Sequence, residues 1–346
     1  MRLLQAIKEI VLSHQPSRIV AKSVRNLFFP AILKSDLRRT ISIEVSSVCD
    51  AKCIFCNYRF DYREKKIASL EWFTSVARSS IALGYRHLDL TSMGGELFTH
   101  KNAVEIIRAA KDAGFETIST FTNAIQLHRF NIDKFLTSGI SYLFISTPGF
   151  SDDVYRQLFG VHKYSDFKKS VEMLLATHQR LNSTVEIFFE PRTYLTMKEL
   201  QQSEFYSTCI ARYLGERIHF NRPLRVFDTW GGDITGRDMI NDMKIDLNPL
   251  KSLAPFKKVH PCERLFMVGI HANGDVRLCN CRYDSSIETK YDTLRIDSLA
   301  SGEDLEALMQ RNDAKIKKVR RDFVNGRLPT LCEKCPFYIP VRYTKE

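Results

Sequence analysis

Apolar and polar positions alternate in a regular order through the middle of the chain. Between residues 40 and 223, short runs rich in β-branched residues are separated by longer stretches whose apolar residues recur at helical spacing. The short runs cover residues 41–45, 87–90, 117–121, 142–145, 185–189 and 217–220, and the helical stretches include 70–83, 103–113, 166–175 and 197–213. Six strand–helix repeats predict a parallel sheet with helices outside it.

The number of repeats limits the architecture of this region. Six units are too few for a closed eight-fold barrel, so we expect an α/β fold with an open, partial (βα)6 TIM-like barrel over residues 40–235. Gly84, Gly114 and Gly139 each follow a helical stretch, where a glycine accommodates a left-handed backbone. In parallel α/β folds the chemistry lies at the carboxyl ends of the strands, so candidate residues are sought there.

The two ends of the chain have a different pattern. Residues 1–39 are predicted to form a helical extension that packs on the main domain; a basic amphipathic helix on a membrane surface is the alternative. Residues 236–346 are predicted to form a C-terminal appendage. Within it, Asn273-Gly274 between two apolar runs predicts a β-hairpin, and a helix follows over 302–323.

Composition excludes several classes of protein. The chain has 346 residues, 44% hydrophobic and 26% charged, which is typical of a globular protein and not of a disordered chain, a collagen or a small disulfide scaffold. No uncharged apolar stretch reaches the roughly 18–20 residues of a membrane helix, so we expect no transmembrane segment. The first apolar run is broken by charges and is a poor signal peptide, which predicts a cytoplasmic location.

The formal net charge of +11 favours an anionic partner, such as a phosphorylated metabolite, a nucleotide sugar, nucleic acid or acidic lipid, although solubility explains it equally well. The basic residues over 315–321 lie among few aromatic residues on a predicted helix. A solvated helix face is therefore the favoured interpretation, and nucleic acid is not the favoured partner.

Three cysteines, Cys49, Cys53 and Cys56, directly follow the first predicted strand. Three thiolates so close together can hold three irons of a cubane cluster and leave the fourth iron open for a small molecule. Zinc is the competing metal, because thiolates suit both. Structural zinc needs four ligands, and no nearby histidine or cysteine completes this set.

The C-x3-C-x2-C spacing, with Phe55 before the last cysteine, resembles the signature of the radical SAM enzymes. Three later strand ends strengthen the resemblance. Gly94-Gly95-Glu96 resembles the GGEP motif, with Leu97 in place of proline. Thr122-Asn123-Ala124 resembles TNG, with alanine in place of glycine, and Ser146 follows the fourth strand, where a polar residue often contacts the cofactor.

The resemblance implies a cofactor and a reaction. Cys49, Cys53 and Cys56 would bind a [4Fe–4S] cluster whose open iron chelates the amino and carboxylate groups of S-adenosylmethionine. Phe55, Gly94, Gly95, Glu96, Asn123 and Ser146 would contact the cofactor. One electron, supplied by a flavodoxin- or ferredoxin-like reductant, would cleave S-adenosylmethionine to a 5′-deoxyadenosyl radical that abstracts hydrogen from the substrate.

A second group of cysteines lies near the C-terminus: Cys262, Cys279, Cys332 and Cys335. Spacing alone is compatible with a zinc site or an iron–sulfur site. Beside the first group, it resembles the twitch/SPASM appendage of radical SAM enzymes, a hairpin plus helix, which implies one auxiliary [4Fe–4S] cluster. Cys281 could replace Cys279 as the ligand, although the G-x4-C spacing favours Cys279.

Other candidate residues carry weaker signals. Arg222 and Arg225 follow the sixth strand and could clamp an anionic substrate, with Trp230 nearby as a further substrate contact; an ordinary linker explains them equally well. Cys209 lies in a helical stretch, where a buried structural cysteine is the favoured interpretation. Cys209 and Cys281 are the two thiols left over for a hydrogen donor.

Together these features predict a radical SAM oxidoreductase-type enzyme that acts on a small polar substrate: a carbohydrate, a cyclitol or a nucleotide sugar. Oxidation through the auxiliary cluster is the favoured outcome. A peptide or protein maturase of the SPASM type and an epimerase that uses a cysteine hydrogen donor are the alternatives. A zinc-bound nucleic-acid-binding protein would explain the charge, but not the order of motifs at successive strand ends.

Overall fold

The computed structural model describes residues 31–32, 39–61, 63–227, 234–245, 261–279, 294–300, 302–335 and 341–342. A nine-stranded sheet dominates these residues, in the order β12-β11-β10-β2-β3-β4-β5-β6-β7. Its parallel part comprises β2 (Thr40–Ile43), β3 (His87–Asp89), β4 (Thr117–Thr122), β5 (Tyr142–Thr147), β6 (Glu186–Pro191) and β7 (Ile218–Phe220). All six predicted strands are present and lie side by side in chain order, so the predicted open α/β barrel is confirmed.

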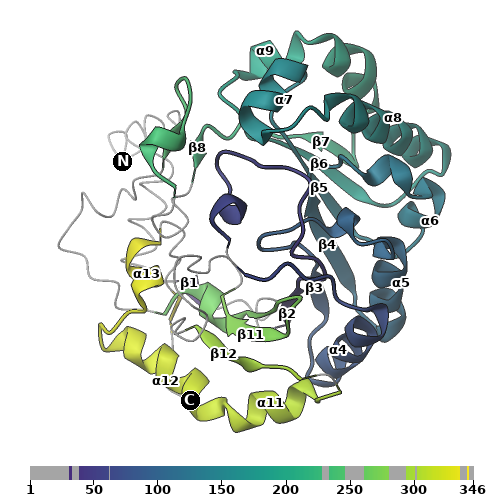
Figure 1. The fold of residues 1–346 in the computed structure, drawn as a ribbon. Coiled ribbons are helices and arrows are strands. Elements are labelled where there is room, and N and C mark those ends of the chain that lie inside the picture. Colours follow the sequence, from purple (N-terminus) through teal and green to yellow (C-terminus); the bar gives the residue numbers. More distant parts are fainter. Residues whose placement is uncertain are drawn as a thin grey trace, which may run out of the picture.

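Helices cover one face of this curved sheet, and the loop after β2 lies inside its arc (Figure 1). The helices between the parallel strands are α4 (Leu70–Ala82), α5 (Ala103–Ala113), α6 (Ile132–Leu136), α7 (Asp152–Phe159), α8 (Tyr164–Arg180) and α9 (Met197–Gln201). Along β4, β5 and β6 buried side chains alternate with half-buried or exposed ones, as expected when one face packs on helices and the other is more open. The open face lines the interior of the arc.

The glycines after the helices behave as predicted. Gly114 caps α5 with φ of 112°, a left-handed conformation, and its N–H donates to carbonyls in the last turn of the helix. Gly84 and Gly139 also have positive φ. These residues end the helices and turn the chain back toward the sheet.

The predicted hairpin is present and joins the main sheet. Strands β10 (Val268–Ile270) and β11 (Asp275–Leu278) are antiparallel, and β10 pairs in parallel with β2. Strand β12 (Arg295–Ser298) pairs with β11 and ends the sheet. The sheet thus continues across the predicted boundary between 40–235 and 236–346, and that division stays a prediction.

Two predicted helices are interrupted. The stretch 197–213 is helical only as α9, followed by a π-helical turn at Tyr206–Ile210 and a short 3-10 turn at Ala211–Tyr213. The stretch 302–323 divides at Asn312 into α11 (Leu305–Arg311) and α12 (Asp313–Val324). The Asn312 side chain donates to Asp297 Oδ2 and to the Leu308 carbonyl, which favours a break there because such bonds compete with helix continuation.

Four short strands and one short helix are also described. Strand β1 (Ala31–Ile32) pairs in parallel with β13 (Val341–Arg342), and β8 (Val226–Phe227) pairs in parallel with β9 (Lys244–Ile245). The short helix α13 (Thr330–Lys334) precedes β13. The predicted N-terminal helix 1–39 lies mostly outside the described residues, and where it is described, β1 is a strand and not a helix, because its backbone pairs with β13.

No helix in the described part of the chain has both the length and the apolar composition needed to cross a membrane.

Candidate active site

The loop that carries Cys49, Cys53 and Cys56 begins just after β2, at the carboxyl edge of the parallel strands. Local hydrogen bonds fix its shape. The Cys49 N–H donates to the Tyr58 hydroxyl at 3.1 Å, and the Cys56 N–H donates to the Cys53 carbonyl at 3.1 Å. Cys56 also caps the short 3-10 helix Asn57–Phe60, since the Tyr58 N–H donates to its sulfur at 3.5 Å.

The three thiols are half-buried and influence one another electrostatically. Burial raises the pKa of Cys53 well above its ordinary value, and negative charge on Cys56 and Cys49 adds to the rise. Burial also raises the pKa of Cys49 and of Cys56. Without a cation the thiols therefore keep their protons, whereas bound iron would deprotonate them.

Glu96 connects the loop after β3 to the end of β4, beside this loop. Its side chain is 4% exposed. Oε1 accepts hydrogen bonds from the Phe98 N–H and the Thr122 hydroxyl, and Oε2 accepts from the Asn123 N–H. Burial, with the nearby carboxylate of Asp50, raises the pKa of Glu96 to about 7. The acid of the Gly-Gly-Glu motif thus lies between the cysteine loop and the end of β4.

Gly95 allows close contact between backbones at this point. A Cβ at position 95 would lie 2.1 Å from the Ser46 carbonyl oxygen. The next residue continues the contact, because the Glu96 N–H donates to the Val48 carbonyl at 2.8 Å. The loop after β3 therefore packs against the start of the cysteine loop, and this is possible only without a side chain at 95.

Asn123 faces the cysteine loop from the end of β4. Its Nδ2 donates to Asp50 Oδ1 at 2.8 Å and lies 3.9 Å from Cys49 Sγ. Ala124 has φ of 56°, so it adopts the left-handed conformation in which the resembling motif has glycine. The chain accepts the strain of a left-handed alanine, about 1–2 kcal/mol, and keeps the turn.

Sequence reasoning missed Glu44, a fully buried acid on the loop side of β2. Its Oε2 accepts from the Met93 and Gly94 N–H groups, and its Oε1 accepts from Arg63 Nη1 at 3.2 Å. Arg63 Nη1 also donates to His271 Nδ1 at 2.8 Å, which requires the proton of a neutral His271 to be on Nε2. The sequence contains a signal for this role, because an acidic residue within a predicted apolar strand is rarely buried without a partner.

The interior face of β4–β7 has an aromatic row beneath a polar one. Phe121, Phe144, Phe188 and His219 stand in register on neighbouring strands, with ring centroids 4.6, 5.0 and 4.6 Å apart and nearly parallel planes. One step nearer the carboxyl edge, Ser146 lies opposite Glu190, and Asn221 Nδ2 donates to Glu190 Oε1 at 2.6 Å. The predicted residue Ser146 therefore belongs to a polar row at the open edge.

The structure locates the other predicted residues as follows. Phe55 is buried and stacks on Phe227 at 4.7 Å, so its ring is anchored to β8. Arg222 is exposed after β7, whereas Arg225 forms an ion pair with Asp242. The clamp formed by the two arginines stays a prediction. Trp230 and Cys281 lie outside the described residues.

Cys209 lies in the segment between β6 and β7. It is 4% exposed within the π-helical turn, and the charged groups that influence it are Glu172 on α8 and Arg212. Burial raises the pKa of Cys209 to about 11. Its burial within this turn favours the interpretation of a structural cysteine.

The second group of cysteines surrounds the hairpin. Cys262 precedes β10, and Cys279 directly follows β11, where its N–H donates to the Met267 carbonyl at 3.1 Å. Cys279 has φ of 61°, an uncommon left-handed conformation for a residue other than glycine. Cys332 lies in α13 and Cys335 ends it. A backbone hydrogen bond of 3.0 Å from Val341 to Pro261 ties the segment after α13 to the residue before Cys262.

Within the described ranges, no group of three histidine, cysteine, aspartate or glutamate side chains is arranged to hold a single metal ion. A cubane cluster requires a different arrangement, because each thiolate binds its own iron.

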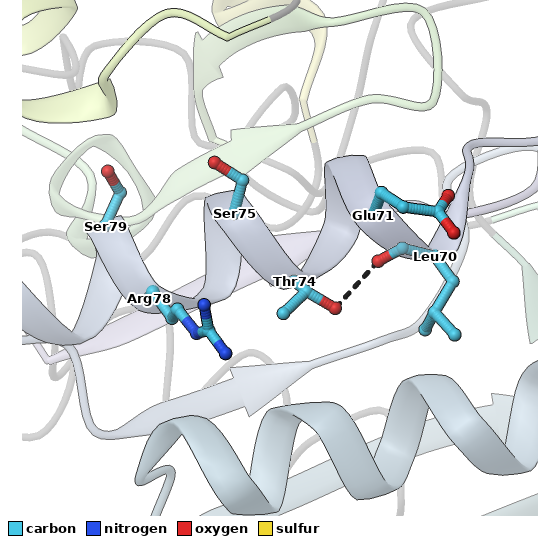
Figure 2. Close-up of a pocket in the computed structure, with 6 residues that line it drawn as sticks. All are labelled: Leu70, Glu71, Thr74, Ser75, Arg78 and Ser79. Carbon is cyan, nitrogen blue, oxygen red and sulfur yellow. Dashed lines mark hydrogen bonds between the residues drawn. The ribbon is translucent and has the colours of Figure 1, made fainter.

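A separate hollow lies along the solvent side of α4, lined by Leu70, Glu71, Thr74, Ser75, Arg78 and Ser79 (Figure 2). The residues that line it come from one helix, opposite its buried face, and include none of the candidate residues.

Comparison with known proteins adds to this geometry. Residues 43–192 match the model of the radical SAM superfamily. The curated relatives include probable GTP 3′,8-cyclases of Saccharolobus solfataricus, 27% identical over 124 residues, and of Sulfurisphaera tokodaii, 29% identical over 126 residues. Each match covers 36% of this chain and 38–39% of the relative, so it spans well under half of either protein.

Solved structures with a similar chain path include BtrN in complex with AdoMet and 2-DOIA, with a TM-score of 0.49, 13% identity, and coverage of 89% of this chain and 96% of that one. Streptococcus suis SuiB bound to S-adenosylmethionine has a TM-score of 0.48, 14% identity, and coverage of 93% and 74%. The matched range 43–192 contains the three clustered cysteines, Glu96 and Asn123, and it runs from β2 to the end of β6. The cysteine loop and the strands around it therefore form a radical SAM domain.

Proposed function

We propose that this radical SAM enzyme abstracts hydrogen from a small polar substrate, and that Cys49, Cys53 and Cys56 hold its [4Fe–4S] cluster. The observation that carries the proposal is the position of three thiols in one short loop at the carboxyl edge of the sheet, with Glu96 and Asn123 facing them. A carbohydrate, a cyclitol or a nucleotide sugar is the substrate class that we favour.

The residues at this edge fit a bound cofactor. Three thiols supply soft ligands of the type that iron–sulfur clusters require. Two buried oxygens, Asp50 Oδ2 and Ser92 Oγ, have no hydrogen-bond partner in the described part of the chain. Both lie on loops that follow the first two parallel strands, so polar groups of a ligand at this edge would satisfy them.

The chain's own residues would orient that ligand. Asn123 donates to Asp50, and Glu96 accepts from the Asn123 amide and the Thr122 hydroxyl at the end of β4, so hydrogen bonds connect the loops after β2, β3 and β4 into one edge. When bound, the cluster and S-adenosylmethionine supply one-electron reductive cleavage and a radical that abstracts hydrogen. The protein's part is to fix the two relative to the substrate and to keep water away.

The interior face of the strands supports a small polar substrate. The aromatic row of Phe121, Phe144, Phe188 and His219 forms an apolar floor, and Ser146, Glu190 and Asn221 provide hydrogen-bonding groups above it. Arg192 lies over the Phe121 ring, 5.8 Å from its centroid, and its charge lowers the pKa of Cys53 and Cys56 against the larger effect of burial. A hydroxyl-rich substrate would match this surface.

For the outcome we propose a two-electron oxidation, with an auxiliary [4Fe–4S] cluster held by Cys262, Cys279, Cys332 and Cys335 as electron acceptor. The left-handed backbone of Cys279 supports its role as a ligand over Cys281, because such strain is concentrated at functional positions. The burial of Cys209 within the π-helical turn argues against it as a hydrogen donor in an epimerase.

GTP is the second candidate substrate. The curated relatives are named for a GTP cyclisation, and the net charge of +11 suits a triphosphate. Cyclisation of a substrate onto itself removes no electrons from it overall, whereas oxidation removes two, so the two candidates differ in the electron balance of the product.

The experiment begins with anaerobic analysis of iron, acid-labile sulfide and zinc in the purified full chain. We expect about eight irons and eight sulfides, four for each [4Fe–4S] cluster. Stoichiometric zinc without sulfide would contradict the proposal.

The reduced protein is then incubated with S-adenosylmethionine and GTP, nucleotide sugars or cyclitols in deuterated water. Oxidation gives one 5′-deoxyadenosine per oxidised product, whereas an isomeric product that carries solvent deuterium at carbon would indicate epimerisation.

A further inference from the structure

The Glu44 carboxylate accepts hydrogen bonds from three separate parts of the chain. Its Oε2 accepts from the N–H groups of Met93 and Gly94, at 2.9 and 3.3 Å. Its Oε1 accepts from Arg63 Nη1 at 3.2 Å and from the Ala272 N–H at 3.4 Å. This fully buried carboxylate therefore joins the loop after β3, the segment after the cysteine loop and the hairpin turn.

Arg63 is held in place on the side away from Glu44 as well. Its Nε and Nη2 donate to the two carboxylate oxygens of Asp61, at 3.0 and 3.1 Å. Its Nη1 donates to His271 Nδ1 at 2.8 Å. The guanidinium is a rigid planar group, so these bonds fix the direction in which it presents its remaining donors to Glu44.

The bonds to Glu44 determine how the peptide groups of the loop after β3 are oriented. A peptide group is planar and trans, so its N–H and its C=O point in opposite directions. Because the Met93 and Gly94 N–H groups point to Glu44, the carbonyls of Ser92 and Met93 point away from it. Among the described residues, none donates a hydrogen bond to these two carbonyls.

The same loop contains a further unsatisfied group and is fixed at its other end. The Ser92 hydroxyl is buried and has no hydrogen-bond partner in the described part of the chain. Two residues on, Gly95 packs directly on the Ser46 carbonyl, and the Glu96 N–H donates to the Val48 carbonyl. The loop thus carries a group of acceptors that suits a ligand with N–H donors, and the ammonium group of S-adenosylmethionine is such a donor.

We propose that Glu44, Arg63 and His271 are positioning residues for S-adenosylmethionine. Glu44 orients the peptide groups before Met93 and Gly94 so that their carbonyls are available to the cofactor, and Arg63 and His271 hold Glu44 in place. The inference rests on the proposed function and on the predicted contact of the Gly-Gly-Glu motif with the cofactor. His271 lies outside the range 43–192, so the hairpin takes part in cofactor binding through a residue of its own.

The first test is Glu44→Gln in the full-length holoenzyme. Glutamine has the same size, but its NH2 group must face either the Met93 and Gly94 amides or Arg63, all of which are donors. Calorimetry on the oxidised protein measures S-adenosylmethionine binding without catalysis. The dissociation constant should rise about tenfold, the worth of one hydrogen bond to a charged group. Hydrogen exchange of the Met93 and Gly94 amides should become faster in the protein without S-adenosylmethionine.

Asp275→Asn is the control for a purely structural effect. The Asp275 side chain accepts from Arg295 and Asn273 in the same hairpin, so its replacement weakens the hairpin without removing a bond to Glu44. This variant should lower the stability of the protein and leave the dissociation constant for S-adenosylmethionine unchanged. Exchange of the Met93 and Gly94 amides should also be unchanged.

His271→Phe and His271→Asn form a matched pair at the other end of the network. Phenylalanine removes the acceptor for Arg63 Nη1, whereas the Oδ1 of asparagine can take the place of Nδ1. His271→Phe should raise the dissociation constant about threefold, and His271→Asn should restore it to the wild-type value. This pair decides the matter alone if Glu44→Gln does not retain its cluster.

Three results would overturn the inference: wild-type affinity in Glu44→Gln, an equal loss of affinity in Glu44→Gln and Asp275→Asn, or equal affinities in the two His271 variants. A wild-type holoenzyme that does not bind S-adenosylmethionine would instead contradict the proposed function.

Discussion

Glu44 and Arg63 form a buried ion pair at the centre of the candidate site, with Arg63 Nη1 3.2 Å from Glu44 Oε1 and the Glu44 side chain fully buried. Through its other oxygen, Glu44 holds the Met93 and Gly94 amides, while Arg63 reaches His271 in the hairpin turn. One pair thus connects β2, the loop after β3 and the C-terminal hairpin. The hairpin therefore contributes to the same edge of the sheet as the cysteine loop.

Replacement of Arg63 should destabilise the protein strongly. Arg63→Met leaves the buried Glu44 charge without its partner, which we expect to lower the free energy of unfolding by about 3 kcal/mol or more. Arg39→Met is the matched control, because Arg39 pairs with Glu116 at the exposed surface and should cost under about 1 kcal/mol. Anaerobic urea unfolding measures the free energy of unfolding of both variants. An equal decrease in the two variants would show that the buried network does not stabilise the fold.

Gly95 should tolerate no side chain. Gly95→Ala places a Cβ 2.1 Å from the Ser46 carbonyl oxygen, so the loop after β3 must move away from the cysteine loop, at a cost of about 3 kcal/mol. Gly215→Ala is the control, since nothing lies within 4 Å of a Cβ there. Thermal unfolding and S-adenosylmethionine binding by calorimetry measure the effects. Unchanged binding by Gly95→Ala would show that the contact does not shape the cofactor site.

The strand order and the motif positions could be predicted because they depend on local pattern. Each apolar run became a parallel strand, and Asn273-Gly274 forms the predicted hairpin turn. The register of the hairpin on β2 could not be predicted, because it depends on contacts between residues more than two hundred positions apart, such as Glu44 with Ala272. The break at Asn312 was missed for a similar reason, since its partner Asp297 lies on β12.

Asp275 should make the hairpin sensitive to acid. Burial opposes its ionisation, but hydrogen bonds from Arg295 and Asn273 outweigh burial and hold the pKa of Asp275 below its ordinary value of 3.8. A lowered pKa in the folded state contributes stability above pH 3.8, and this stability is lost as the pH falls through the folded value. Asp275→Asn should therefore cost about 2 kcal/mol at pH 7.

The pH profile of unfolding checks this prediction. The difference between wild type and Asp275→Asn should shrink as the pH falls below about 4. Asp153→Asn is the control, because Asp153 is 81% exposed in its ion pair with Arg156 and should give no measurable difference at any pH. A constant difference for Asp275→Asn down to pH 2 would mean that the carboxylate charge is not what stabilises the hairpin.

The second cysteine group should be separable from the first. Cys332→Ala with Cys335→Ala removes two proposed ligands in and after α13, so about half of the iron should be lost while some S-adenosylmethionine cleavage remains. Product formation should stop if the auxiliary cluster accepts the substrate electron. Iron analysis and product quantification follow both effects, and an unchanged product yield without the auxiliary iron would make that cluster structural only.

The central claim is tested most directly by the formation of 5′-deoxyadenosine by the reduced protein, measured by mass spectrometry for the wild type and for a variant with Cys49, Cys53 and Cys56 all replaced by alanine. The wild type should cleave S-adenosylmethionine, and the triple variant should lose about half of its iron and all of this cleavage, because the proposed ligands of the open iron are gone. Full retention of 5′-deoxyadenosine formation by the triple variant would contradict the account.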